Sequence, residues 1–288
     1  MKLGTTSLAC LIAALLAGPA VGQYGTGYED YDASADGVAL TDQGGYYMPT
    51  PETSVDCLVY TYTDNPLLIQ ANPNGGEKFV AGTGPADSVF ARAQITPDPG
   101  MFGDGTGMWT VSYDVAVSFT GERPSAQNVG SFSLQPEADP LNPSSSVFIG
   151  LAQWSDPALA DGWDANYIAY DADGNYVYPS VVPDEAFQNL QNGHWYRWST
   201  TFDFDTNMIV QASITDLTTG ETTTAELDGW YLGGGAVGGL DTPTGFRYFA
   251  GSSTVAGNTM AFDNMEIVPE PGCFTALSLL GLLLLRRR

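Results

Sequence analysis

The sequence predicts an all-β protein with an antiparallel β-sandwich fold, and three observations lead to this class. The stretch 109–119 alternates apolar and polar residues with the period of two that is typical of a half-buried strand. Similar short segments are separated by turns rich in Gly, Asp and Asn, in a chain with 34 glycines and 18 prolines. No long amphipathic helix is evident. Short strands joined by such turns are typical of sandwiches and jelly rolls.

The clearest strand places Trp109, Val111, Tyr113, Val115, Val117 and Phe119 on one face. Further strands are expected at Ser131–Gln135, Ser146–Ala152, Asn166–Tyr170, Tyr176–Tyr178, His194–Phe204, Met208–Asp216, Thr222–Leu227, Phe246–Ala250 and Met260–Val268. Turns are expected at Asp171–Asn175, Asp203–Asn207, Thr218–Gly220 and Gly233–Gly235. The stretch Pro183–Gln191 favours one short helix on a connection.

The N-terminus has the three parts of a secretory signal peptide. Lys2 supplies the positive charge, Leu8–Ala17 the apolar run, and Ala20-Val21-Gly22 a small-x-small cleavage site. We therefore expect signal peptidase to remove residues 1–22, so that the mature chain begins at Gln23.

The C-terminus, residues 268–288, combines a short polar motif, an apolar run and a basic end. The motif is Val268-Pro269-Glu270-Pro271, the run is Cys273–Leu285, and the end is Arg286, Arg287 and Arg288. As a helix the 13-residue run would be roughly 20 Å long, shorter than the roughly 30 Å of bilayer hydrocarbon. The positive-inside rule would keep the arginines in the cytoplasm and the preceding domain outside it. The prolines are expected to interrupt regular structure and leave an extended, accessible backbone.

These three parts, in this order, resemble the PEP-CTERM sorting signal of Gram-negative bacteria. The resemblance implies recognition and cleavage near the motif by an exosortase, and association with exopolysaccharide. The alternative is a plain C-terminal membrane anchor.

Residues 23–267 are enough for one large sandwich or two small domains, and no change of composition requires two. Four of the nine Lys and Arg residues lie in the terminal signals, whereas all 33 acidic residues lie between Gln23 and Pro271, so that segment carries a formal charge of −28. Such a charge argues against nucleic acid and anionic membrane surfaces as partners. We expect membrane contact only through the C-terminal helix.

Cysteine usage excludes an intramolecular disulfide in the mature domain. Cys10 lies in the signal peptide and Cys273 in the tail, which leaves Cys57 alone. We expect Cys57 to be buried as a small apolar side chain, in a domain stabilised by a large core.

The central region also resembles a known family. Glu29-Asp30-Tyr31 with Gly44-Gly45-Tyr46, then His194-Trp195-Tyr196-Arg197 with Phe202–Asn207, then Ala261–Ile267, resemble the opening, central and closing segments of exported concanavalin A-like (laminin G-like) jelly-roll domains. The resemblance covers roughly Tyr28–Ile267. Relatives of this fold include lectins, carbohydrate-binding modules and glycoside hydrolases, so it implies a fold more than an activity.

The sequence contains none of three patterns that would indicate a catalytic site of a known kind. No strand carries the Glu-x-Asp-x-(x)-Glu pattern of this fold's glucanases, and His194 is the only histidine. No Gly-x-Ser-x-Gly motif occurs either. A hydrolase still needs only two carboxylates facing each other across a cleft, so an enzyme stays open as the alternative.

Calcium is the metal that the residue types favour, because it prefers carboxylate and carbonyl oxygens. One candidate site joins the two ends of the domain, where Glu29 or Asp30 could meet Asp263 if the first and last strands are neighbours. Related carbohydrate-binding modules hold a structural calcium in such a place. A weaker candidate is Asp171, Asp173 and Asn175, whose alternative reading is a hairpin turn.

Glycan binding needs flat rings beside polar side chains. Trp154, Trp163, Tyr167 and Tyr170 lie near Gln153, Asp156, Asp161, Asp164 and Asn166 in a polar segment, and they are the candidate binding face. The alternative for each ring is a place in the sandwich core.

The sequence thus predicts an exported jelly-roll domain, held briefly at the inner membrane and then sorted to the envelope, the cell surface or the extracellular matrix. The expected function is non-enzymatic and structural or glycan-binding. The alternative is a polysaccharide-active glycoside hydrolase or lyase of the same fold.

Overall fold

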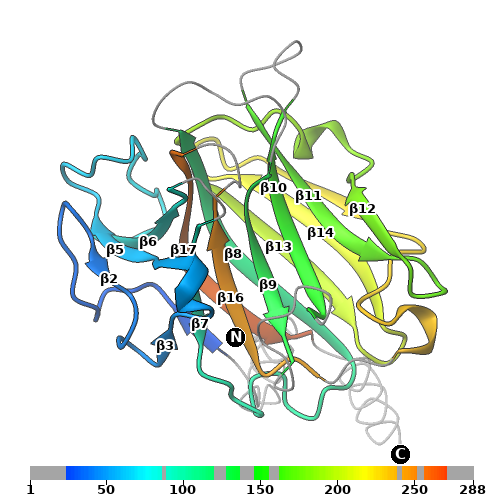
Figure 1. Cartoon of the computed structure of the whole chain (residues 1–288). Helices are drawn as coiled ribbons and strands as arrows, with labels where there is room; N and C mark the ends of the chain where they lie inside the picture. The colour runs from blue at the N-terminus through cyan, green and yellow to red at the C-terminus, as the bar shows by residue number, and fades with distance from the viewer. Residues whose placement is uncertain are drawn as a thin grey trace, which may run out of the picture.

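The computed structural model describes residues 24–85, 89–119, 128–136, 146–155, 162–238, 242–251 and 256–270. The predicted signal peptide 1–22 and the predicted membrane helix and arginines 273–288 lie outside the described residues. Within the described part, no helix is long and apolar enough to cross a membrane. The described chain forms two large β-sheets that pack face to face (Figure 1), and the all-β antiparallel sandwich predicted from the sequence is confirmed.

The first sheet has nine strands and contains both ends of the described chain. Its order is β15 (Thr222–Glu226), β14 (Met208–Asp216), β13 (Tyr196–Asp203), β8 (Met108–Phe119), β17 (Asn258–Pro269), β6 (Lys78–Thr83), β5 (Leu58–Thr61) and β2 (Val38–Ala39). The ninth strand, β1 (Tyr24–Thr26), pairs with the C-terminal half of β17, beyond the residues that pair with β6. The first and last strands are therefore neighbours, as expected.

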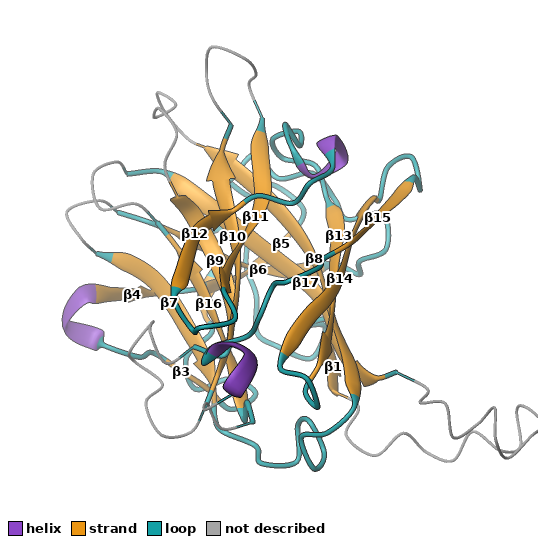
Figure 2. Cartoon of the chain, turned by 90° about the vertical axis from the view of Figure 1, so that its right-hand side faces the viewer, coloured by secondary structure: helices purple, strands orange, loops and turns teal. Residues whose placement is uncertain are grey.

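The second sheet has eight strands. Its order is β12 (Tyr176–Ser180), β11 (Trp163–Tyr170), β10 (Phe148–Trp154), β9 (Asn128–Gln135), β16 (Gly245–Ala250), β7 (Phe90–Ile95) and β3 (Tyr46–Tyr47). The short strand β4 (Ser54–Asp56) pairs with β7 in parallel, whereas the other pairs are antiparallel. Figure 2 shows β7, β9 and β16 on one side of the sandwich and β8, β13 and β14 on the other.

Helix is limited to single 3-10 turns in the described residues. They are η1 (Pro51–Thr53), η3 (Glu185–Phe187) and η4 (Gly235–Val237). The turn η3 lies where the sequence predicts a short helix, and the side chain of Asp184 caps it by accepting from the amide of Ala186.

The sandwich core follows the predicted alternation. Trp109, Val111, Tyr113, Val115 and Val117 of β8 are all buried in it. Large aromatics fill the space between the sheets, and Gly150 of β10 makes room for them, because a Cβ there would lie 2.7 Å from Tyr113 Oη. Cys57 is buried and free, as predicted.

A second, smaller core covers the outer face of the nine-stranded sheet. Residues 62–77 fold over this face, and Leu67 and Ile69 pack there against Phe79, Ala116 and Trp195. The Trp195 indole donates to the carbonyl of Gln70 over 2.7 Å, which holds the segment in place. This cover brings Asn72 and Asn74 over the middle of β8 and β17.

Candidate functional site

Three of the four aromatics predicted as a glycan-binding face lie in the sandwich core. Trp154, Trp163 and Tyr167 are almost fully buried. The Trp154 indole donates to Asn258, and the Tyr167 hydroxyl is hydrogen-bonded with Trp198 and Thr200. The prediction that these rings form a binding face is wrong, because they point to the opposite sheet and no ring face is open to a sugar.

The fourth residue, Tyr170, lies at the end of β11 and leads to an exposed pair of rings. It is nearly buried and contacts Tyr176 of β12 edge to face, at 5.9 Å between ring centroids. Tyr176 and Tyr178 are 54% and 47% exposed, and their rings are stacked at 6.0 Å with only 10° between the planes. Because β12 is the edge strand of its sheet, no further strand lies beyond these two residues in the described part.

A row of amide side chains begins beside Tyr178. The Tyr178 hydroxyl donates to Asn128 Oδ1 over 2.7 Å, and Gln153 Nε2 donates to the same oxygen over 2.9 Å. Asn166 Nδ2 then donates to Gln153 Oε1 over 3.0 Å. The row therefore crosses from β12 to β9, β10 and β11 on the outer face of the eight-stranded sheet.

The two features together have the chemistry of a carbohydrate-binding surface. Tyrosine rings present flat apolar faces with a polar tip, and amides can both donate to and accept from hydroxyl groups. Gln153 and Asn166 were already noted in the sequence as polar neighbours of the expected site. The two tyrosines were assigned only to a strand, although the spacing Tyr-Val-Tyr places both rings on one face.

The turn Asp171–Asn175 is the hairpin that joins β11 to β12. Asp171 Oδ1 accepts from the amides of Asp173 and Asn175, and the Asn175 side chain donates to the same carboxylate. These hydrogen bonds lower the pKa of Asp171, and the one from the Asn175 side chain has the largest effect. The Asp171 carboxylate thus stabilises the turn in which it lies, which corresponds to the hairpin-turn alternative of the sequence analysis.

The two ends of the domain meet at the other candidate calcium site. The backbone of Gly75 lies against Asp263 and that of Gly76 against Glu29, with no space for a Cβ at either glycine. Glu29 Oε1 accepts from the amides of Glu77 and Lys78, whereas Asp30 is exposed.

Protein donors already occupy the carboxylate of Asp263. Its Oδ2 accepts from the Tyr62 hydroxyl over 2.9 Å and from Asn72 over 3.2 Å, and its Oδ1 accepts from the Asn264 amide. In the described residues, no group of three or more His, Cys, Asp or Glu side chains could hold a metal ion. This arrangement does not fit a calcium ion, which would need oxygens free of such donors.

We accordingly expect a chelator to leave the thermal midpoint of the purified domain unchanged. A calcium ion bound only by the folded state would raise the midpoint, and the rise would grow with the logarithm of the free calcium concentration above the dissociation constant. Melting curves in EDTA and in millimolar calcium measure the difference. A midpoint that rises with calcium would support the site at Glu29 and Asp263 and contradict the arrangement described above.

Asp263 belongs instead to a buried polar cluster with Asp114, its direct partner on β8. Both carboxylates are fully buried. Asn72 Nδ2 donates to both of them, and Asn264 Nδ2 donates to Asp114 over 2.8 Å. Arg197 of β13 donates to Asp114 over 3.1 Å and to Glu266 over 2.8 Å. Burial raises the pKa of Asp263 to about 7, although its hydrogen bonds partly offset the effect.

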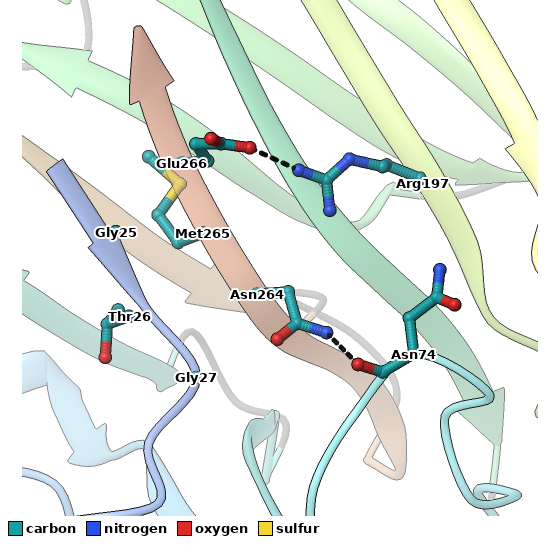
Figure 3. Close-up of a pocket in the computed structure, with 8 residues that line it drawn as sticks. All are labelled: Gly25, Thr26, Gly27, Asn74, Arg197, Asn264, Met265 and Glu266. Atoms are coloured by element: carbon teal, nitrogen blue, oxygen red, sulfur yellow. Dashed lines mark hydrogen bonds and ion pairs between the residues drawn. The ribbon is translucent and has the colours of Figure 1, made fainter. Parts of the chain in front are cut away.

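A groove of about 510 Å³ lies beside this cluster, between β1 and Arg197. Figure 3 shows Glu266 and Asn264 of β17 reaching Arg197 and Asn74, with β1 on the other side of Met265. The two buried aspartates do not line the groove. We therefore read the cluster as the connection between the 62–77 segment, β8, β13 and the bulge of β17.

The predicted sorting motif begins inside β17. Val268 and Pro269 are the last residues of the strand and pair with Thr110 and Trp109 of β8. Pro269 is itself the last residue of the strand, so regular structure ends one residue later than the predicted end at Val268. Pro271, Arg286, Arg287 and Arg288 lie outside the described residues.

No family model matches the chain, and no curated protein matches it. Among solved structures, the globular domain of T. cruzi calreticulin is similar, with 10% identity, a TM-score of 0.49, and coverage of 87% of this chain and 88% of that one. The CBM2 module of the evolved Dit of Lactobacillus casei BL23 phage J-1 has 13% identity and a TM-score of 0.45, over 86% of this chain and 96% of that one. Basic winged bean lectin with Tn-antigen has 12% identity and a TM-score of 0.39, over 87% of this chain and 99% of that one. None of these likenesses establishes a family for the chain.

Proposed function

We propose that this protein is an exported, non-enzymatic glycan-binding protein, and that its binding surface is formed by Tyr176 and Tyr178 with Asn128 and Gln153, while the buried Asn166 holds Gln153 in place. The observation that carries the proposal is the stacked, half-exposed tyrosine pair beside amides that are already ordered by hydrogen bonds. Side chains that are fixed before binding lose less conformational entropy when a ligand arrives.

The composition of the surface sets the class of ligand. Apolar ring faces next to neutral donors and acceptors suit the alternating C–H faces and hydroxyl groups of a sugar chain. The formal charge of −28 over residues 23–271 disfavours strongly acidic polymers by repulsion. We therefore propose neutral or weakly charged polysaccharide as the ligand.

Replacement of either tyrosine by alanine should weaken retention on polysaccharide by about tenfold or more. Truncation of a central aromatic in an interface typically costs about 2 kcal/mol, and about 1.4 kcal/mol corresponds to a factor of ten. Affinity electrophoresis of Tyr176→Ala and Tyr178→Ala on a panel of polysaccharide gels measures the effect.

Leu68→Ala is the matched control for surface truncation. Leu68 is 72% exposed on the segment that covers the other sheet, so its loss should leave retention unchanged. If both tyrosine variants are retained like the wild type on every polysaccharide that binds it, the proposed surface is wrong.

The same gels and soluble polysaccharides also test the enzymatic alternative. Release of reducing ends that is abolished by a single carboxylate substitution would show that the protein is a hydrolase, and the non-enzymatic part of the proposal would fail. Formation of an unsaturated product would indicate a lyase.

We further propose that signal peptidase removes residues 1–22 and that an exosortase processes the C-terminal signal, so that the domain reaches the envelope, the surface or an exopolysaccharide matrix. The support is the PEP-CTERM resemblance together with the pairing of the two chain ends. Tyr24 lies opposite Ile267, so both segments that await removal adjoin the same corner of the domain.

The sorting proposal predicts a mature protein that lacks residues 273–288. Mass spectrometry of the surface-associated or released form gives its C-terminal peptide. Intact peptides from the apolar run 273–285 in that form would show that the segment is a permanent anchor instead.

A further inference from the structure

The last residues of β17 are bonded to the sheet at the position where the predicted motif begins. Val268 and Pro269 pair with Thr110 and Trp109, and the amide of Glu270 donates to the carbonyl of Met108 over 2.8 Å. The Glu270 side chain is held as well, because its Oε1 accepts from the Thr110 hydroxyl over 2.5 Å. Three of the four motif residues are therefore part of the folded domain.

The strand β1 supports this arrangement from the other side of β17. Tyr24, Gly25 and Thr26 pair with Ile267, Glu266 and Met265, directly before the motif. Figure 3 shows β1 running beside this part of β17. The Tyr24 ring contacts Phe246 edge to face, which fixes the start of β1 on the sandwich. Since β8 and β1 flank β17 at Glu266 and Ile267, these residues cannot leave the sheet without breaking pairs on both sides, and β8 continues the pairing through Val268 and Pro269.

A peptidase usually binds its substrate as an extended chain, through hydrogen bonds to the substrate backbone. In the folded domain the backbone of β17 is already hydrogen-bonded to β8, up to the amide of Glu270. A peptide bond within 265–270 is therefore poorly available to a second protein while the domain is folded.

We infer that the folded domain sets the position of its own processing, with the scissile bond C-terminal to Glu270. The inference rests on the proposed sorting function. The mature chain then keeps Val268, Pro269 and Glu270 in β17. The step is the hydrolysis of one peptide bond: water adds OH to the carbonyl carbon, the C–N bond breaks, and the remaining proton goes to the amine of the released tail.

The C-terminus of the mature protein tests the inference directly. The full chain is expressed in the cells that process it, and intact mass with C-terminal peptides defines the end of the product. We expect one product that ends at Glu270 or beyond. A product that ends before Glu270 would overturn the inference without affecting the sorting proposal, whereas a retained 273–285 segment would contradict the sorting proposal itself.

A variant that loosens β17 should broaden the cleavage. The double substitution Tyr24→Ala with Thr110→Val removes the ring that fixes β1 and the hydroxyl that holds Glu270. We expect a second, shorter product to appear for this variant. Thr215→Val is the matched control, because among the described residues the Thr215 hydroxyl bonds to Thr222, within the β14–β15 pair. It should give the wild-type product.

Hydrogen exchange supplies a readout that does not depend on any peptidase. In the full chain, a peptide covering 267–270 should exchange at least about tenfold more slowly in the wild type than in the double variant. Equal and rapid exchange in both proteins would show that the motif is not held by β8, and the inference would fail even if the tail is processed.

Discussion

Replacement of Asp114 by alanine is expected to lower the free energy of unfolding by about 3–5 kcal/mol. The carboxylate is fully buried and accepts from three segments: Arg197 on β13, Asn72 on the covering segment and Asn264 at the bulge of β17. Without it, Asn72 Nδ2 loses one of its two acceptors and the Arg197 guanidinium keeps only Glu266. A buried donor left without a partner costs about 1–3 kcal/mol. Urea unfolding of the purified domain measures the loss, and the thermal midpoint should fall by about 10 °C.

One further variant separates the charge of Asp114 from its shape, and a second serves as the control. Asp114→Asn keeps the volume but offers fewer acceptor lone pairs, so it should lose less stability than the alanine variant. Asp173→Ala removes an exposed carboxylate from the β11–β12 turn and should stay within about 0.5 kcal/mol of the wild type. A loss for Asp114→Ala as small as that of the Asp173 control would show that the cluster does not stabilise the fold.

The strands of this sandwich could be predicted because burial on one face imposes a period of two on each of them. The stretch 109–119 became β8, and the segments expected from residue 131 onward all contain a strand. The strands before β8 were missed. β2 and β3 have only two residues each, too few for an alternation to be recognised. β6 has six residues, but four successive ones are buried, so it does not show the period of a half-buried strand.

Which face of a strand is the core could not be predicted for the aromatic residues. Tyr167 and Tyr178 both occur in alternating segments, yet one is buried and the other is half exposed. The difference comes first from the face of the sheet, since Tyr167 of β11 points into the core, whereas Tyr178 of β12 lies on the outer face with the amide row. Strand order depends on contacts between distant residues, and the local pattern does not contain that information.

The buried cluster was missed for the same reason. Asp263 was expected to meet Glu29 or Asp30, because these residues lie near the two chain ends. Its partner is Asp114, which stands at a polar position of an ordinary alternating strand. Only the register of β8 against β17, together with the segment that covers them, brings the two carboxylates to one buried site.

The second large effect concerns the pH dependence of stability, and Asp263 is its source. Burial raises the pKa of this carboxyl to about 7 in the folded protein, whereas an aspartate in an unfolded chain titrates near 3.9. Between these values the folded state binds more protons than the unfolded state. The contribution of Asp263 to stability is therefore fully present below about pH 4, declines as the pH rises, and is lost above about pH 7. A difference of about three pH units corresponds to an upper limit of about 4 kcal/mol.

The substitution Asp263→Asn should remove this dependence, because an amide has no proton to lose in that range. Relative to the wild type, the variant is expected to gain stability by up to a few kcal/mol between pH 5 and pH 8. Denaturant unfolding at several pH values gives the difference in the free energy of unfolding between the two proteins. The contributions of the other carboxylates are common to both proteins and cancel in this difference. Asp173→Asn is the control and should follow the wild type throughout. If the difference between Asp263→Asn and the wild type is the same at pH 5 and pH 8, then the buried carboxyl does not change its protonation over this range, and it must carry its charge inside the cluster at both pH values.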